Sequence, residues 1–213
     1  MSQSANPTGL RLNSLLAEAG QAPLDAAETG RFEELLSLIL RWNARMNLTA
    51  IRDEEGILSR HFVESICCAR ALPAGIATLL DFGSGAGFPG IPIALCRPEI
   101  RVTLAESQGK KAAFLQEAVR VLGISASVHA QRVELLAGPF DCVTMRAVDR
   151  MAQAVKTAAR LVRSGGWLAL MSTEGELEGL QAAAGEEFSW PRTSPLPGGG
   201  DRILAIGERQ RRA

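Results

Sequence analysis

The apolar positions of the first 75 residues repeat at helical spacing. A short helix is predicted over residues 10–19, before Gly20. A second helix follows Thr29 and Gly30, and its apolar residues recur every three or four positions to form one stripe: Phe32, Leu35, Leu36, Ile39 and Leu40. A third is predicted over residues 54–72 and ends at Pro73. The first third of the chain is therefore expected to be helical.

From Leu79 onward, short apolar runs alternate with helical patterns. Strands are predicted at residues 79–82, 102–106, 127–130, 140–147, 167–171, 188–190 and 203–206. Helices are predicted at residues 91–96, 110–122, 151–162 and 176–184, with a short turn or helix at 132–136 and a loop at 195–200. The segment Ser164-Gly165-Gly166 is expected to stop the helix at 151–162 before the next strand begins.

Repeated strand–helix units predict an α/β fold, a doubly wound and mostly parallel sheet with helices on both faces. Two regions are predicted from this change in the hydrophobic pattern. Residues 1–75 are expected to form a helical N-terminal extension packed on the catalytic domain, and residues 76–213 to form a Rossmann-like domain.

Composition narrows the possible environments and partners. Lys plus Arg and Asp plus Glu both number 23 among 213 residues, so strong non-specific binding to nucleic acid is not indicated, although a local basic face stays open. The four cysteines form no C-x-x-C pair, and only two histidines could join them, so no metal site is expected. Residues 1–9 lack the apolar core of a signal peptide, and no run of about 18 apolar residues occurs. We expect a cytoplasmic protein with no membrane association.

The stretch from Leu79 to Gly90 carries the chemistry of the chain. An apolar run ends in Asp81 and is followed by closely spaced glycines and the start of a helix. Glycine lets backbone N–H groups approach a ligand closely, and the helix dipole adds a positive field there. Such loops bind adenosine cofactors.

Two cofactor classes fit this loop. The spacing Gly85-x-Gly87-x-x-Gly90 satisfies the dinucleotide fingerprint. The pattern Asp81-x-Gly83-x-Gly85-x-Gly87 looks like the first motif of Rossmann-like methyltransferases that bind S-adenosylmethionine. Glu106 can accept hydrogen bonds from ribose hydroxyls in either class. The acid before the first glycine favours the methyltransferase, and a dinucleotide enzyme remains the alternative.

The residues at the end of the fourth strand indicate which kind of group accepts the methyl. In methyltransferases of this fold it faces the transferred methyl, and enzymes that methylate exocyclic amines often carry an Asn/Asp-Pro-Pro-aromatic signature there. Residues 141–150 contain no such signature. A guanine N7 carries a lone pair and no proton, so its methylation needs positioning rather than a general base. Arg146 is the candidate catalytic residue, able to orient the cofactor carboxylate or to bind a guanine oxygen or a phosphate.

Several segments resemble one family in order along residues 10–207. They are Arg41-Trp42-Asn43, Asn47-Leu48-Thr49, residues 60–66, residues 81–92, Arg97-Pro98-Glu99, Glu106-Ser107 with Lys110-Lys111, and Arg146-Ala147. The chain is similar to the bacterial small-subunit ribosomal RNA guanine-7-methyltransferases G, the glucose-inhibited division protein B family. The Gly-Phe-Pro-Gly-Ile-Pro extension at residues 87–92 is its most specific part.

The resemblance implies methyl transfer from S-adenosylmethionine to N7 of a guanine in the 530 loop of 16S rRNA. The substrate would be free rRNA, the 30S subunit or an assembly intermediate, and the protein is expected to be a monomer. The implied cofactor-binding residues are Asp81, Gly83, Gly85, Phe88, Glu106, Val133, Glu134 and Arg146. The polar and aromatic residues expected to flank the cleft, or else to serve helix packing and capping, are Trp42, Asn43, Asn47, Arg60 and His61.

One position departs from the family, which commonly has a Lys-Gly pair after the fifth strand where this chain has Met171-Ser172-Thr173. We expect a basic rim around the cleft nonetheless, formed by Arg60, Lys110, Lys111, Arg146 and Arg150. Two other functions stay open: a methyltransferase for a small molecule or a protein, and a cofactor-binding factor of ribosome assembly without activity.

Overall fold

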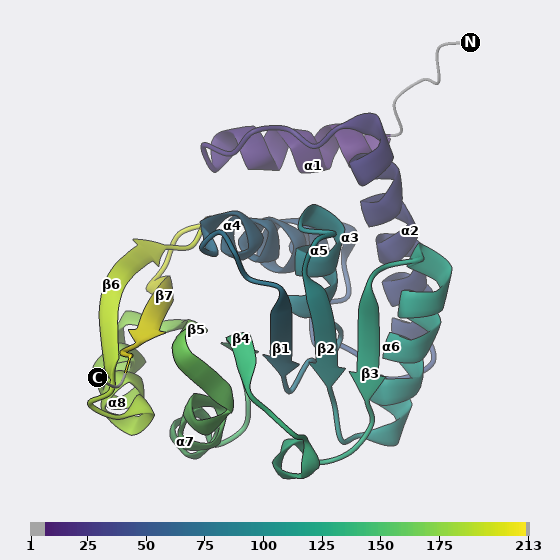
Figure 1. Ribbon diagram of the computed structural model, residues 1–213. Coiled ribbons are helices and arrows are strands. Elements are labelled where there is room, and N and C mark those ends of the chain that lie inside the picture. Colours follow the sequence, from purple (N-terminus) through teal and green to yellow (C-terminus); the bar gives the residue numbers. More distant parts are fainter. Residues whose placement is uncertain (1–6, 212–213) are drawn as a thin grey trace.

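In the computed structural model, which describes residues 7–211, a seven-stranded sheet runs through the centre of the molecule (Figure 1). Its strands are β1 (Thr78–Phe82), β2 (Arg101–Ala105), β3 (Ala126–His129), β4 (Phe140–Arg146), β5 (Val162–Thr173), β6 (Phe188–Pro195) and β7 (Arg202–Arg209). Their order is β3-β2-β1-β4-β5-β7-β6. Within this described part of the chain, only β7 runs antiparallel to its neighbours, so the mostly parallel sheet is confirmed.

The helical segments follow the predicted order. They are α1 (Pro7–Glu18), α2 (Ala26–Asn43), α3 (Glu54–Gly56), η1 (Ile57–Val63), α4 (Glu64–Ala71), α5 (Gly90–Cys96), α6 (Gly109–Leu122), η2 (Val133–Leu135), α7 (Met151–Leu161) and α8 (Glu174–Ala184). Residues 1–6, part of the segment from which a signal peptide was judged absent, lie outside the described residues. None of the helices in residues 7–211 combines the length and apolar character that crossing a membrane requires.

Helices cover both faces of the sheet. Successive strand residues point to opposite faces, so Leu79 and Leu80 of β1 belong to two different cores. The first core joins α1, α2, η1, α4, α5 and α6 to the sheet, and the second lies under α7 and α8. In Figure 1, α1 crosses the top of the molecule and α2 descends beside α6. The helices before β1 thus share a core with the sheet, and the division at residue 75 stays a prediction.

The predicted helix end near residue 162 is confirmed, but the prediction that Ser164-Gly165-Gly166 separates this helix from a strand starting at residue 167 is wrong. Strand β5 begins at Val162, directly after α7, and continues through both glycines to Thr173. Its pairing with β4 shifts register between Phe140 and Cys142. Glycine inside a strand often marks a bulge or a close backbone approach, and a Cβ on Gly166 would lie 2.8 Å from the carbonyl oxygen of Asp141. Strand β6 likewise extends to Pro195, the first residue of the predicted loop.

The predicted helix at residues 54–72 is one continuous helical segment with a π-helical middle. The π-helical part is η1, between α3 and α4. Such wider turns disturb the regular ladder of backbone bonds and often occur at functional sites. Here the carbonyl oxygen of Arg60 accepts a hydrogen bond from Nη2 of Arg146, on β4, at 2.7 Å. The irregular helix is therefore tied to the sheet where β4 ends.

Candidate active site

The carboxyl ends of β1, β2 and β4 meet at one edge of the sheet, the lower edge in Figure 1. The chain passes from β1 to β2 and β3 on one side and then returns to β4 on the other side of β1. This reversal is a topological switch point, where open α/β sheets bind their ligands. Two neighbouring cavities lie here and share Ala147 and Val148 in their walls.

The larger cavity has a volume of about 470 Å³, within the roughly 300–1,000 Å³ typical of small-molecule sites. It is lined by Phe82, Gly83, Ala105, Glu106, Ser107, Gln108, Lys111, Gln131, Arg132, Val133, Glu134, Ala147, Val148 and Asp149. Four of the expected cofactor ligands are brought together in this wall: Gly83, Glu106, Val133 and Glu134.

The glycine loop and Glu106 form one hydrogen-bonded unit beside this cavity. The carboxylate of Glu106 accepts from the N–H of Gly85 at 3.0 Å and from the N–H of Gln108 at 2.7 Å. Each carboxylate oxygen keeps a further lone pair, so Glu106 can still accept from ribose hydroxyls. Gly83 has a φ of +70°, and a Cβ there would lie 3.1 Å from Cγ2 of Val148. The site therefore fits an adenosine cofactor, and the positive φ of Gly83 favours glycine at that position.

The loop leaves few donors for a pyrophosphate. The N–H of Gly85 bonds Glu106, that of Gly87 bonds the carbonyl oxygen of Ser84, and that of Gly90 bonds Oδ2 of Asp81. Dinucleotides depend on such N–H groups at the start of the helix. S-adenosylmethionine has no phosphate, and the arrangement favours it over the dinucleotide alternative.

Asp81 is a buried structural acid rather than part of either cavity wall. Its Oδ1 accepts from the Thr144 hydroxyl at 3.0 Å, and its Oδ2 accepts from the N–H of Gly90 at 3.1 Å. Burial raises the pKa of Asp81 to about 6, although its hydrogen bonds act in the opposite direction. The acid of the motif thus holds the end of β1, the start of α5 and β4 together.

Phe88 also lies away from both cavity walls, packed against the N-terminal helices. Its ring stacks on His61 with centroids 4.5 Å apart and contacts Phe62. Nε2 of His61 is 2.8 Å from the Thr49 hydroxyl. Burial, with the charges of Arg146 and Arg60, lowers the pKa of His61 to about 3, so its ring is neutral at physiological pH. His61 thus packs against Phe88 with its ring in the neutral form.

The smaller cavity, of about 230 Å³, contains Arg146. Nη2 of Arg146 donates to Oε2 of Glu64 at 3.0 Å, while Nη1 is buried without a partner in residues 7–211. Oε1 of Glu64 accepts from the Nε atoms of Arg202, at 2.7 Å, and of Arg60, at 3.2 Å. We call Glu64 with these three arginines the arginine cluster. One carboxylate faces three guanidinium groups, so the cluster carries a net charge of +2.

Neither Glu64 nor Arg202 is among the site residues predicted from the sequence. In the sequence, the signal that could have pointed to Glu64 is a carboxylate within a helical stretch that is otherwise mostly buried. In the structure, the Glu64 side chain is 1% exposed. Arg202 has no local signal, because it reaches the cavity from the start of β7. There it pairs in register with Thr173, so a cation is present beside the segment where the family's lysine is missing.

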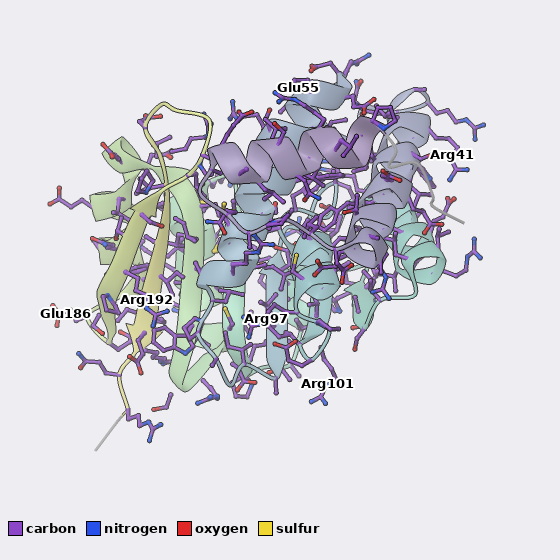
Figure 2. All side chains as sticks on the ribbon, turned by 90° about the horizontal axis from the view of Figure 1, so that it is seen from above. Arg41, Glu55, Arg97, Arg101, Glu186 and Arg192 are labelled. Atoms are coloured by element: carbon purple, nitrogen blue, oxygen red, sulfur yellow. The ribbon has the colours of Figure 1, made fainter. Side chains whose placement is uncertain are left out.

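The predicted basic rim is divided among several places. Arg60 and Arg146 belong to the arginine cluster, Lys111 lines the larger cavity, and Lys110 lines a third hollow beside the ends of α2 and α6. Arg150 lies near α7 and α8. The third hollow also contains Arg41, which Figure 2 shows on the opposite side of the molecule from Arg192.

The polar residues near the end of α2 are mainly structural. Nε1 of Trp42 donates to Glu117 on α6 at 2.8 Å, and its ring lies edge-on to Phe114. The buried Asn43 accepts from the N–H groups of Leu48 and Thr49. Asn47 accepts from Nη2 of Arg52. Of the five N-terminal residues expected near the cleft, Arg60 is the one that lines either of the two cavities.

A family model described as rRNA small subunit methyltransferase G matches residues 28–189. The chain belongs to this family. A curated relative named ribosomal RNA small subunit methyltransferase G, from Xanthomonas axonopodis pv. citri (strain 306), is 42% identical over 151 residues, which cover 70% of each chain. The resemblance inferred from the motifs is thereby confirmed.

Solved structures agree on the fold. A predicted O-methyltransferase from Agrobacterium tumefaciens is 24% identical, with a TM-score of 0.58 over 70% of this chain and 82% of that one. A SAM-dependent O-methyltransferase from Thermotoga maritima is 14% identical, with a TM-score of 0.59 over 84% and 72%. The Rossmann-like methyltransferase fold is thus confirmed. The match to the methyltransferase G family includes both cavities apart from Leu196 and Arg202.

Proposed function

We propose that the protein transfers a methyl group from S-adenosylmethionine to N7 of a guanine in the 530 loop of 16S rRNA. The observation that carries this proposal is the family match, which includes the glycine loop and most of the two adjoining cavities. The substrate would be 16S rRNA, free or in a 30S subunit or assembly intermediate. The protein would act as a monomer in the cytoplasm.

The larger cavity is the site we assign to the cofactor. Glu106 would accept hydrogen bonds from the ribose hydroxyls, and Gly83 would allow the cofactor to approach the backbone closely. Val133 and Glu134 would border the adenine. When bound, S-adenosylmethionine supplies an electrophilic methyl group on its sulfonium. The buried Nη1 of Arg146, which has no partner among residues 7–211, is a donor available to the cofactor carboxylate or to the acceptor base.

The protein's task is orientation rather than proton transfer. Guanine N7 has a free lone pair and no proton at neutral pH, so an in-line approach needs no general base. His61 is held neutral against Phe88, and the carboxylate of Glu64 is bound by three guanidinium groups. Neither side chain is therefore proposed to take up a proton, and Glu64 would hold Arg146 in place beside the acceptor.

RNA binding would use the cations of the predicted basic rim that lie in the two cavities and in the third hollow, although the formal net charge of the chain is zero. About three phosphate contacts would give a slope of about −2 for log K against log salt. Lys110→Gln should make this slope about one unit shallower, whereas Arg101→Gln, at the opposite end of β2, should leave it unchanged. A flat line for the unaltered protein would refute the basic rim.

The decisive experiment measures transfer of labelled methyl from S-adenosylmethionine to 30S subunits that lack the modification. Free 16S rRNA and a guanosine pool serve as parallel acceptors. Label that maps to N7-methylguanosine in the 530 loop supports the proposal. Label elsewhere in rRNA would reject the site, and label in guanosine alone would favour a small-molecule enzyme. Cofactor binding without any transfer would favour a ribosome-assembly factor.

A further inference from the structure

The smaller cavity lies directly beside the larger one, behind Ala147 and Val148. Its volume of about 230 Å³ is below the roughly 300 Å³ at which small-molecule sites begin, so it suits a single base better than a nucleotide cofactor. Ala147 between the cavities has a φ of +48°, and such strained backbone in a non-glycine residue clusters at functional sites.

The polar lining of this cavity combines donors and an acceptor. The donors are the guanidinium groups of the arginine cluster. Glu64 takes the Nε–H of Arg60 and of Arg202, and Nη2 of Arg202 donates to the carbonyl oxygen of Pro197 at 3.2 Å. The outer nitrogens of Arg60 and Nη1 of Arg202 are left for a ligand. The acceptor is Glu176 on α8, whose Oε2 accepts from the hydroxyls of Ser172, at 2.7 Å, and Thr173, at 2.9 Å.

Glu176 is an ionised acceptor that keeps lone pairs for a ligand. The hydroxyls of Ser172 and Thr173 lower its pKa below the ordinary value, so it is a carboxylate at physiological pH. The N–H of Thr173 lowers the pKa in the same direction, and the two carboxylate oxygens keep lone pairs that can accept from a ligand. The side chain is exposed at the cavity mouth, where an entering ligand can reach it.

An arginine together with a carboxylate matches the edge of guanine. Guanine presents the acceptor O6 next to the donors N1–H and N2–H₂, whereas adenine presents a donor and an acceptor in the reverse order. This pairing uses the Watson–Crick edge and leaves N7 free of any donor. Pairing occupies the Watson–Crick edge of a base, and stacking keeps the base from entering a pocket, so the guanine must be flipped out of its helix or loop.

We propose that the smaller cavity binds the acceptor guanine, with Glu176 accepting from N1–H and N2–H₂ and an arginine of the cluster donating to O6. This inference rests on the proposed function and adds a residue that selects guanine. The net charge of +2 on the arginine cluster also suits a base that arrives with its phosphates.

Glu176 also has a structural position, as the third residue of α8 after the N-cap Thr173. Glutamine serves at that position in capping boxes as well as glutamate does. Glu176→Gln therefore keeps the helix start but replaces one carboxylate oxygen with an NH₂ group that cannot accept from guanine. A purely structural role predicts no effect of this change on catalysis.

The test compares Glu176→Gln with Glu178→Gln, an exposed glutamate of the same helix outside the cavity wall. The full-length variants are assayed for labelled methyl transfer to 16S rRNA or 30S subunits. We expect Glu176→Gln to lower kcat/KM at least tenfold, because a hydrogen bond to a charged group is lost. Its affinity for S-adenosylmethionine and its melting temperature should be unchanged, and Glu178→Gln should behave as the unaltered protein.

A second arm replaces the target guanine with inosine, which lacks the 2-amino group, by ligating a synthetic segment into 16S rRNA. The unaltered protein should prefer guanine several-fold, and Glu176→Gln should lose most of that preference. Full activity of Glu176→Gln, or loss of its cofactor binding, would overturn the inference and leave the proposed function standing. Absence of rRNA methylation by the unaltered protein would overturn both.

Discussion

Replacing Glu64 with glutamine tests whether the arginine cluster is held together by its one buried carboxylate. Glu64 is 1% exposed, and its partners Arg146 and Arg202 have side chains that are 13% and 19% exposed. Removing one member of a buried ion pair costs about 3–5 kcal/mol, because the remaining charge is left without compensation. Glutamine keeps the volume and one carbonyl acceptor, so we expect about 3 kcal/mol. Arg60, at 43% exposure, adds less than about 1 kcal/mol.

The assay is reversible unfolding by heat or urea at neutral pH. For a chain of this size, 1 kcal/mol shifts the melting temperature by about 2–4 °C, so Glu64→Gln should lower it by roughly 6–12 °C. The matched control is Glu99→Gln, which removes a 56% exposed carboxylate from its pair with Arg97. That change should cost less than about 1 kcal/mol. Equal stabilities of the two variants would refute the reasoning about burial.

Three further predictions concern the glycine loop and its acids. Gly90→Ala should lower the free energy of unfolding by about 1–3 kcal/mol, because a Cβ would lie 2.6 Å from Oδ2 of Asp81, whereas Gly179→Ala on α8 meets nothing within 4 Å and should be stabilising. Glu106→Gln should raise the Kd for S-adenosylmethionine about tenfold or more in calorimetry, and an unchanged Kd would exclude a ribose contact. The pKa of Asp81, raised to about 6, predicts that its protonation stabilises the folded state as the pH falls from 7 toward 4. Relative to Asp81→Asn, the unaltered protein should gain about 1 kcal/mol between pH 7 and pH 5, and parallel stability curves would contradict this.

The sequence predicts the fold well because its signals are local. The alternation of apolar runs and helical stripes from Leu79 onward predicts the strands of the sheet and the helices that connect them. The first and last residues of these elements are harder to predict from the sequence. Helix α2 begins at Ala26, where Asp25 and Glu28 form a capping box that the apolar stripe does not reveal. The glycines at 165 and 166 were interpreted as a stop, but in the structure they belong to a strand with a register shift.

Some residues of the candidate site could likewise be predicted from local motifs, whereas others could not. Gly83 and Glu106 were predictable because the carboxyl ends of neighbouring parallel strands meet at one edge of the sheet. Phe88 belongs to the same motif but packs away from both cavities, since the N-terminal helices cover that part of the loop. Glu64 lies 82 residues from Arg146 and 138 from Arg202. Contacts over such separations depend on the tertiary fold, and no rule based on residue spacing predicts them.

The arginine cluster changes how the N-terminal extension should be regarded. Glu64 and Arg60 come from the helices before β1, whereas Arg146 and Arg202 come from β4 and β7. The same helices share the first core with the sheet. Removing them would uncover part of the first core, which α5 and α6 also cover, and leave two largely buried arginines without their carboxylate. The boundary near residue 75 therefore separates two patterns in the sequence, but the helices before it complete both the core and the smaller cavity.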